Sequence, residues 1–311
     1  MDYTLVHYDV EKWERLAFGF VRDELLKLGW PVGDVTFDQT LVTRGLILDL
    51  KLGNIVKANR FGYVKRACHG TQMLSFEEQR HIYTRTQIDL RESRWKFLNT
   101  LFSISEGCLF ANLVDAMDRE SFVGPKTYKE MFETIAHILG EVHSQGRLKE
   151  QIMADPASFV DLDPEIPLTL LEQKEAGKKI LLITNSEWTY AEAMMRYAFD
   201  PFLPGSMTWR DLFEYIIVGA RKPTFFDSQN PAFEVISNDG SLRPTAGLLT
   251  PGKAYVGASA SLIEKSLELE GEELLYIGDH LFVDVNVSKN ISRWRTALVL
   301  RELEEEIDTA S

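Results

Sequence analysis

The sequence predicts an α/β protein with a doubly wound parallel sheet, and three observations lead to this fold class. The second half of the 311-residue chain alternates short apolar runs with amphipathic segments, as strands separated by helices do. The apolar runs, such as KILLIT at residues 179–184, are continuous, as expected for strands buried on both faces. Polar residues follow these runs directly, at the strand ends where ligands bind in such sheets.

Each element of this half has its own signal. A first helix is expected to begin after Pro167 and to end at Gly177, because proline suits the first turn of a helix and glycine its end. The amphipathic segments predict helices at 168–176, 190–199 and 262–269. The apolar runs predict strands at 179–184, 213–218, 254–257, 274–277 and 295–300.

The stretch from about residue 65 to residue 164 interrupts this pattern. Apolar residues recur there at helical spacing and predict one long amphipathic helix that ends near Gly146, with a second helix expected at 95–102. The apolar positions of the long helix are Tyr128, Met131, Phe132, Ile135, Leu139 and Val142. We therefore expect residues 1–64 and 165–311 to form the core and residues 65–164 to form a helix-rich cap insertion that covers the ligand edge of the sheet.

Composition and charge exclude several classes of protein. The chain has 34 basic and 47 acidic residues, a net charge of −13, which argues against a partner that is a nucleic-acid polymer. An anionic substrate would need a local positive site or a metal. Cys68 and Cys108 cannot make a disulfide framework, and the chain shows neither a membrane-spanning run nor an export signal, so we expect a cytoplasmic protein that does not contact a membrane. The sequence leaves the oligomeric state open, and a homo-oligomer is compatible with it.

Polar motifs follow three of the predicted strands. Thr184, Asn185 and Ser186 come directly after a strand, where a hydroxyl and backbone N–H groups can hold a phosphate oxygen. The alternative is that Thr184 or Ser186 caps the next helix. Asp279 and Asp284, five residues apart after another strand, suit a hard cation such as Mg²⁺, although two solvated acids in a turn are also compatible with this pattern.

Lys222 follows the strand at 213–218 and could neutralise a phosphate and a carboxylate together. The alternative is a surface basic pair, formed with Arg221, before a proline turn. The chain also opens with the string D-Y-T-L, in which Asp2 taken alone is a terminal acid.

The order of these motifs resembles that of the haloacid dehalogenase (HAD) phosphohydrolase superfamily. The strings FDQTLVTRGLILDLKLGNIVKANRFG, LITNSEWTY, ARKPTFF and LLYIGDHLFVDV are similar to those of one branch, the cytosolic IMP/GMP-type (purine) 5′-nucleotidases. The resemblance runs from Met1 to about residue 305. It implies a HAD-like Rossmannoid core and Mg²⁺-dependent hydrolysis of nucleoside 5′-monophosphates through an aspartyl-phosphate.

The resemblance also assigns roles to the motif residues. Asp2 would be the general acid and base, and its carbonyl would bind Mg²⁺ together with Asp279 and Asp284. Thr184 would bind the phosphate with Asn185 and Ser186 beside it. Lys222 would balance the charge of the nucleophile and the phosphoryl group.

The first motif departs from the family pattern. In the family it reads D-x-D-Y-T-L and its first Asp attacks phosphorus, whereas here Met1 occupies the x position. The nucleophile would therefore be the residue just before Met1. The buried strand that carries this residue in the family would also precede Met1. Two explanations remain open: the natural protein is longer than this chain, or the chain is a catalytically silent nucleotide-binding or interaction homologue.

The residues that the family uses for specificity agree only in part. Asn99 and Phe102 match an Asn and a Phe that hold the purine nucleotide, and His143 and Lys149 match a His and a Lys on the cap. The Arg and Asp that family enzymes use nearby fall here on two residues without charge, Ala136 and Gly140. The alternatives are a core aromatic for Phe102 and a surface histidine for His143. The resemblance thus supports a phosphohydrolase more firmly than it supports a purine substrate.

Overall fold

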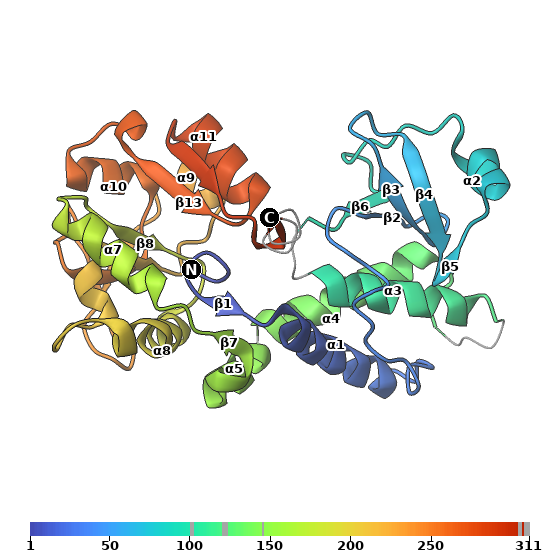
Figure 1. The fold of residues 1–311 in the computed structure, drawn as a ribbon, viewed down its shortest axis with the longest axis horizontal. Helices are drawn as coiled ribbons and strands as arrows, with labels where there is room; N and C mark the ends of the chain where they lie inside the picture. The colour runs from blue at the N-terminus through green and yellow to red at the C-terminus, as the bar shows by residue number, and fades with distance from the viewer. Residues whose placement is uncertain (100–102, 120–123, 145, 304–306, 308–311) are drawn as a thin grey trace. The chain divides into compact units, whose positions relative to one another are not determined.

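The computed structural model describes residues 1–99, 103–119, 124–144, 146–303 and 307, and the chain divides into two compact units. Unit 1 consists of Met1–Asp9 and Ile152–Ser311, and unit 2 consists of Val10–Gln151 (Figure 1). The sequence led us to expect different boundaries, with residues 1–64 and 165–311 in the core and residues 65–164 in the cap. The difference arises because residues 10–64 form a helix and two strands that pack with the rest of unit 2.

Unit 1 confirms the α/β class and all five strands predicted from apolar runs. Its larger sheet has the order β11-β10-β12-β9-β8, in which β12, β9 and β8 run parallel and β10 and β11 add an antiparallel edge. The two remaining strands, β13 and β14, form a separate parallel pair. The single wound sheet that we expected is therefore divided in the described structure, with β8 and β13 each at an edge. The strands are β8 (Leu181–Ile183), β9 (Tyr215–Val218), β10 (Ala232–Val235), β11 (Leu242–Pro244), β12 (Lys253–Gly257), β13 (Leu275–Gly278) and β14 (Arg295–Leu298).

The helices of unit 1 lie between these strands along the chain, as predicted. The expected segments 168–176, 190–199 and 262–269 correspond to α7, α8 and α10. Strand β1 (His7–Tyr8) pairs antiparallel with β7 (Val160–Asp161). This pairing joins the two stretches of chain that make up unit 1, Met1–Asp9 and Ile152–Ser311. The helices are α6 (Pro156–Phe159), α7 (Glu165–Glu175), α8 (Trp188–Phe199), η2 (Asp200–Phe202), η3 (Trp209–Leu212), α9 (Thr224–Asp227), α10 (Ala260–Leu267), η4 (Gly271–Glu273), η5 (Leu281–Val287), α11 (Ser288–Ile291) and η6 (Arg301–Leu303).

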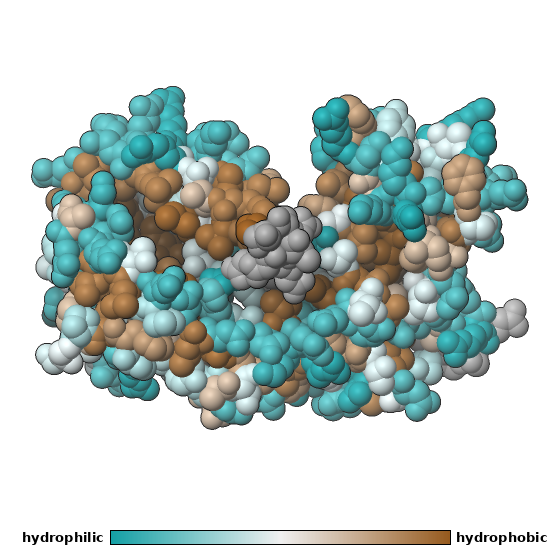
Figure 2. All heavy atoms as spheres, viewed as in Figure 1, coloured by the Kyte–Doolittle hydropathy of each residue, from teal (hydrophilic) through white to brown (hydrophobic). Residues whose placement is uncertain are grey.

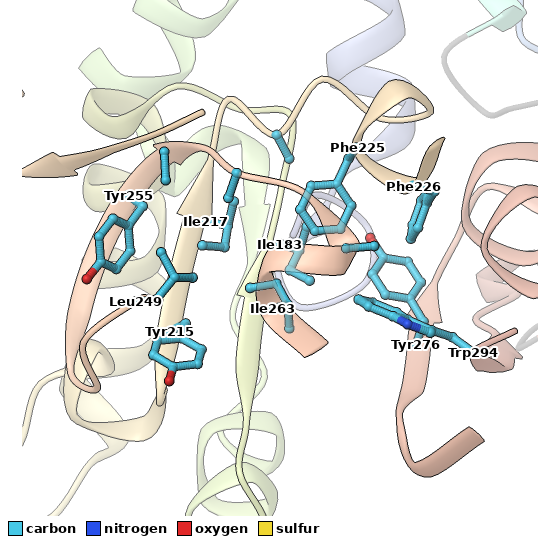
Figure 3. Packing of buried hydrophobic residues seen from close by; sticks show 14 of the residues in the cluster. Ile183, Tyr215, Ile217, Phe225, Phe226, Leu249, Tyr255, Ile263, Tyr276 and Trp294 are labelled. Atoms are coloured by element: carbon cyan, nitrogen blue, oxygen red, sulfur yellow. The ribbon is translucent and has the colours of Figure 1, made fainter. Parts of the chain in front are cut away.

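An aromatic cluster fastens the small β13–β14 sheet to the helices of unit 1 (Figure 3). Phe226 contacts the rings of Tyr276 and Trp294 edge to face, with centroids 5.4 and 5.8 Å apart. Phe225 packs edge to face on Phe226 with centroids 5.2 Å apart, and it is fully buried. Such pairs add about 0.5–1.5 kcal/mol each to the hydrophobic gain of burial. The cluster therefore holds β13 in place, although among the described residues β13 pairs only with β14.

Unit 2 is built on an antiparallel sheet with the order β5-β4-β3-β2-β6. Trp95–Phe97, where we predicted a helix, is the edge strand β6, because its backbone pairs with Ile47–Asp49 of β2; the end of the predicted helix, at 100–102, lies outside the described residues. The long amphipathic helix is confirmed as α4. The elements are α1 (Val10–Lys27), β2 (Ile47–Asp49), β3 (Asn54–Ala58), β4 (Val64–His69), β5 (Gln72–Met73), α2 (Phe76–Tyr83), β6 (Trp95–Phe97), α3 (Ile104–Met117), α4 (Tyr128–Ser144) and α5 (Arg147–Ala154), whose last residues belong to unit 1.

A buried carboxylate ties the strands of unit 2 together. Asp49, at the end of β2, is fully buried and accepts two hydrogen bonds from Arg94, at 2.8 and 2.6 Å. The hydroxyl of Tyr83 donates to the same carboxylate at 2.8 Å and accepts from the amide of Asn54 at 2.7 Å. A buried charge is stable only when it is paired and hydrogen-bonded, and Asp49 meets both conditions.

A second buried acid in unit 2 lies where α1 meets the start of α3. Glu14 is 1% exposed, and its Oε2 accepts a hydrogen bond of 2.6 Å from the backbone N–H of Ser105. Its other carboxylate oxygen has no hydrogen-bond partner among the described residues. Burial is the main reason why the pKa of Glu14 rises from 4.5 to about 7, and the nearby Glu106 adds to the rise. This carboxyl group therefore titrates near neutral pH.

No helix in the described ranges is both long enough and apolar enough to cross a membrane. Both cysteines, Cys68 and Cys108, are free thiols.

Candidate active site

The carboxyl ends of β8, β9 and β13 bring the three polar motifs of unit 1 together. Thr184 follows β8 directly, Lys222 lies four residues after β9, and Asp279 follows β13. The side chain of Asn185 joins the motif after β8 to the backbone of the motif after β9. The side chain of Asn185 donates to the carbonyl of Lys222 at 3.0 Å and accepts from its N–H at 2.6 Å.

The N-terminal segment crosses this edge of the sheet and contacts the ends of both β8 and β13. Asp2 accepts a hydrogen bond of 2.8 Å from the hydroxyl of Ser186, after β8. Thr4 donates a hydrogen bond of 3.0 Å to Asp279, after β13. Tyr3, between them, has φ 55°, a left-handed conformation that is uncommon for a bulky residue. This turn lets Asp2 and Thr4 contact residues at the ends of two strands that belong to different sheets.

Two tyrosines orient the carboxylate of Asp2. The hydroxyl of Tyr8 donates to Asp2 Oδ1 at 2.7 Å, and it lies 2.9 Å from the hydroxyl of Tyr190. Burial, followed by the charge of Asp2, raises the pKa of Tyr8 well above its ordinary value, so Tyr8 keeps its proton and acts as a donor. With Ser186 on its other oxygen, Asp2 is held in one orientation.

Lys222 is the cation of the site, and it forms an ion pair with Asp284. Its side chain is 11% exposed, and its Nζ donates to Asp284 at 2.8 Å and to the hydroxyl of Tyr276 at 2.9 Å. Burial alone would lower the pKa of Lys222, but Tyr276 and Asp284 more than offset this effect and hold the pKa above its ordinary value. Lys222 is therefore a permanent positive charge beside the acids.

A close backbone approach sets the position of Asp284. A Cβ built on Gly278 would lie 2.6 Å from the Cβ of Asp284, so only glycine leaves room for this side chain. The backbone N–H of His280 donates to Asp284 Oδ2 at 3.1 Å, while the His280 ring caps the following helical turn by accepting from the N–H of Val283 at 3.1 Å. His280 therefore orients the loop.

The backbone nitrogen of Met1 lies among these charges. This nitrogen is buried, and it lies close enough to Asp2, Asp279, Asp284 and Lys222 to interact with their charges. Met1 itself is 7% exposed. Met1 is therefore buried beside the charged residues of the site.

The carboxylates of this site are the kind of ligand that a hard cation such as Mg²⁺ prefers. The described residues do not, however, form a complete set of metal ligands. Within the described ranges, no three His, Cys, Asp or Glu side chains converge as metal ligands do. Burial is the main reason why the pKa of Asp279 is raised, and the neighbouring charge of Asp284 adds to the rise. A cation would relieve this repulsion, and Mg²⁺ commonly uses one or two carboxylates and completes its shell with water and substrate phosphate.

The residues expected to hold the nucleoside lie in unit 2. Asn99 is half-buried after β6, Lys149 is half-buried on α5, and His143 is exposed on α4. Phe102 lies outside the described residues. Ala136 and Gly140 lie on α4. The structure thus brings together the predicted residues of unit 1, and the predicted nucleoside contacts remain predictions.

Sequence reasoning missed several residues that build the site. Thr4, Tyr8 and Tyr276 each contact a predicted site residue through a hydroxyl, and Tyr190 contacts the hydroxyl of Tyr8. Thr4 belongs to the D-Y-T-L motif, and its role could have been noticed there. The tyrosines carry no signal in the sequence, because each is far along the chain from most of its partners or reads as a core aromatic.

The fold and the site define a class of protein: an α/β chain that gathers acids, hydroxyls and a buried lysine at the carboxyl edge of parallel strands. Comparison with known proteins then identifies the family. The chain belongs to the 5′-nucleotidase family, whose model matches residues 1–311.

Named relatives agree with this assignment. The chain is 28% identical over 317 residues to a 5′-nucleotidase domain-containing protein of Dictyostelium discoideum, a match that covers 98% of this chain and 53% of the relative. It is 29% identical over 335 residues to 5′-nucleotidase domain-containing protein 1 of Bos taurus and 28% identical over 344 residues to the Homo sapiens protein of the same name. These matches cover 99% and 100% of this chain and 72% of each mammalian protein. The chain thus spans about half the length of the Dictyostelium relative.

Proposed function

We propose that this chain carries most of the catalytic machinery of a Mg²⁺-dependent phosphohydrolase that acts on nucleoside 5′-monophosphates, with purine nucleotides as the expected substrates. The observation that carries the proposal is the convergence of Asp2, Lys222 and Asp279 at one sheet edge. The family assignment supports the reaction class, and the HAD-like mechanism is part of the proposal.

The binding step uses the hydroxyls and the lysine. Thr184 and Ser186 are both buried and follow one strand, and Asn185 locks this turn to Lys222. A phosphate dianion would sit at this turn, where backbone N–H groups and the Lys222 ammonium neutralise it in a site of low dielectric constant. The net charge of −13 makes this local cation necessary, because the global field repels the substrate.

The chemical steps use Asp2 as an acid and then as a base. We propose that a carboxylate on the residue joined to the Met1 nitrogen attacks phosphorus, while the bond from phosphorus to the 5′ oxygen breaks and Asp2 donates its proton to that oxygen. Asp2 then removes a proton from water, whose oxygen attacks the aspartyl-phosphate and releases inorganic phosphate. Tyr8 and Ser186 hold the Asp2 carboxylate in place for both transfers.

Asp279, Asp284 and the carbonyl of Asp2 would hold the Mg²⁺ ion. When bound, the ion would supply charge neutralisation for a dianionic phosphate next to several carboxylates. Thr4 restrains Asp279, and Lys222 with the His280 N–H restrains Asp284, so both acids are positioned by neighbouring groups.

The test is phosphate release from IMP, GMP, AMP, CMP and UMP by a longer chain that adds an apolar strand ending in Asp before Met1. We expect Mg²⁺-dependent release, fastest with a purine nucleotide, and a loss of roughly 10²–10⁴-fold in Asp2→Asn, the range typical of a lost general acid. Asp279→Asn is the metal-site control and should be inactive at ordinary Mg²⁺ concentrations. No Mg²⁺-dependent release from any of the five nucleotides would refute the proposal.

The absence of the charged pair at Ala136 and Gly140 favours a second candidate, a catalytically silent nucleotide-binding or interaction homologue. Calorimetry of the same longer chain with nucleotide and Mg²⁺ separates the two candidates. Binding without turnover would support the silent homologue.

A further inference from the structure

The hairpin of β3 and β4 in unit 2 carries a cluster of positive charge, although the net charge of the chain is −13. From residue 50 to residue 76 the sequence contains five basic residues and no acid. Four of the five, all exposed, lie on the two strands and on the turn between them: Lys57, Arg60, Lys65 and Arg66. We call these four residues the hairpin cations.

The hairpin cations are not neutralised by neighbouring acids. Two other arginines of unit 2, Arg91 and Arg94, form ion pairs with Asp89 and Asp49. None of the hairpin cations forms an ion pair with an acid in the part of the chain that the structure describes. Their charges therefore remain available to an anion from outside the chain.

The pairing of β3 with β4 brings three of these cations to one level of the hairpin. Lys57 is the cross-strand partner of Arg66, and the register shifts beside this pair, so that Lys65 falls between two paired residues. Like charges directly opposite one another destabilise a sheet. Natural proteins accept such local losses of stability mainly at functional sites.

Two exposed aromatic side chains lie on the turn of the hairpin. Phe61 is 57% exposed and Tyr63 is 48% exposed. The guanidinium carbon of Arg60 lies 4.7 Å from the centroid of the Phe61 ring, in a cation–π contact. Aromatic rings next to positive charges are typical of the boundary between water and lipid headgroups.

Hydrogen bonds hold the backbone of this turn in one conformation. The side-chain oxygen of Asn59 accepts from the N–H groups of Phe61 and Tyr63, at 3.0 Å in each case. The side chain of Gln87 donates to the carbonyl of Phe61 at 3.0 Å. The turn thus presents its two aromatic side chains on a fixed backbone, which lowers the conformational entropy that binding would cost.

The position of the turn distinguishes between kinds of anionic partner. Figure 1 shows the turn at the end of the unit 2 sheet that points away from α3 and α4. In the view of Figure 2, hydrophilic side chains cover most of this end of unit 2, with a few hydrophobic ones among them. A projecting turn fits a flat surface, whereas single-stranded nucleic acids bind in grooves that aromatic side chains line.

We propose that the β3–β4 hairpin is a contact site for a membrane surface that contains anionic lipids. The hairpin cations would face the anionic headgroups, and the rings of Phe61 and Tyr63 would enter the headgroup region. This contact is peripheral, and it departs from the expectation, drawn from the sequence, that the chain does not contact a membrane. It does not depend on whether unit 1 hydrolyses a phosphoester.

Sedimentation of the full 311-residue chain with lipid vesicles tests this proposal. The probes are vesicles of phosphatidylcholine alone and vesicles that also contain about 30% phosphatidylserine, an anionic lipid. We expect binding to the anionic vesicles only. Raising the salt concentration from about 0.1 M to about 0.5 M should weaken this binding at least tenfold, because salt screens exposed charges.

Two double variants give the matched comparison. Lys57→Gln with Arg66→Gln should weaken binding roughly 25-fold, since each cation near an anionic surface contributes about fivefold. The same variant should be at least as stable in urea as the wild type, because it removes a repulsion across the hairpin. Lys178→Gln with Lys179→Gln makes the same change of charge at exposed positions of unit 1 and should bind as the wild type does.

A further variant, Phe61→Trp, reports on the position of the turn. Brominated phosphatidylcholine quenches tryptophan emission at short range. In anionic vesicles it should quench the emission of this variant more strongly than that of the wild type, which has six tryptophans of its own. Equal quenching of the two proteins would show that the turn does not enter the headgroup region.

Three sedimentation results would overturn the proposal. One is that the chain does not bind the anionic vesicles, or binds neutral vesicles equally well. Another is equal binding by the wild type and by Lys57→Gln with Arg66→Gln, since the contact would then lie elsewhere. The third is tighter binding to a single-stranded oligonucleotide or to soluble polyglutamate than to the vesicles, because the hairpin would then recognise a different class of partner.

Discussion

The buried carboxyl group of Glu14 predicts a pH-dependent stability of unit 2 that a single substitution should remove. Its pKa is about 7 in the folded chain and 4.5 in the ordinary, solvated state. Replacement by glutamine mimics the protonated form, keeps an oxygen that can accept from the Ser105 N–H, and cannot ionise.

The size and sign of the effect follow from these two pKa values. A raised pKa means that the folded chain holds this proton more tightly than the unfolded chain does. The stabilisation from the proton is complete below pH 4.5 and is lost as the pH rises through about 7. At about 1.36 kcal/mol for each pH unit between the two values, the total is about 3 kcal/mol. We therefore expect Glu14 to make unit 2 less stable at pH 8 than at pH 5 by up to this amount.

The assay is hydrogen exchange of the amides of α1 and α3 at pH 5 and pH 8, corrected for the intrinsic exchange rate and combined with urea unfolding. Glu14→Gln should match the wild type at pH 5 and be more stable at pH 8, by about 3 kcal/mol at most. Asp23→Asn, an exposed acid on the same helix, should leave the pH dependence unchanged. An equal pH dependence in wild type and Glu14→Gln would refute the reasoning.

Three further predictions concern unit 1. Lys222→Met leaves the buried Asp284 carboxylate without its cation, so it should lower the free energy of unfolding, measured in urea, by about 3–5 kcal/mol. Adding Asp284→Asn should recover part of that loss. Gly278→Ala forces Asp284 out of place, so it should lower the free energy of unfolding in the same assay by about 1–3 kcal/mol. The same substitution should abolish phosphate release by the longer chain. Phe225→Ala empties the centre of the aromatic cluster, so it should lower the free energy of unfolding by about 3–5 kcal/mol. Unchanged stability would show that the cluster does not stabilise unit 1.

Part of the site could be predicted because its chemistry is local in the sequence. Thr184, Lys222 and Asp279 each follow an apolar run, and parallel strands bring their carboxyl ends to one edge. The structure places these residues together as expected. The partners that hold them could not be predicted in the same way. Tyr8 and Tyr190 are 182 residues apart, and nothing in the local pattern indicates that their hydroxyls meet beside Asp2.

The sequence alone determined the α/β class of unit 1, the order of its strands along the chain, and the long amphipathic helix of unit 2. These features depend on the periodicity of apolar side chains and on turn residues, which act over short distances along the chain. Only the tertiary structure decided the limits of the two units and made Trp95–Phe97 a strand, since its pairing partner in β2 lies more than forty residues earlier in the chain. It also decided that Glu14 is buried and that β8 and β13 belong to separate sheets, because burial and strand neighbours depend on contacts between distant segments.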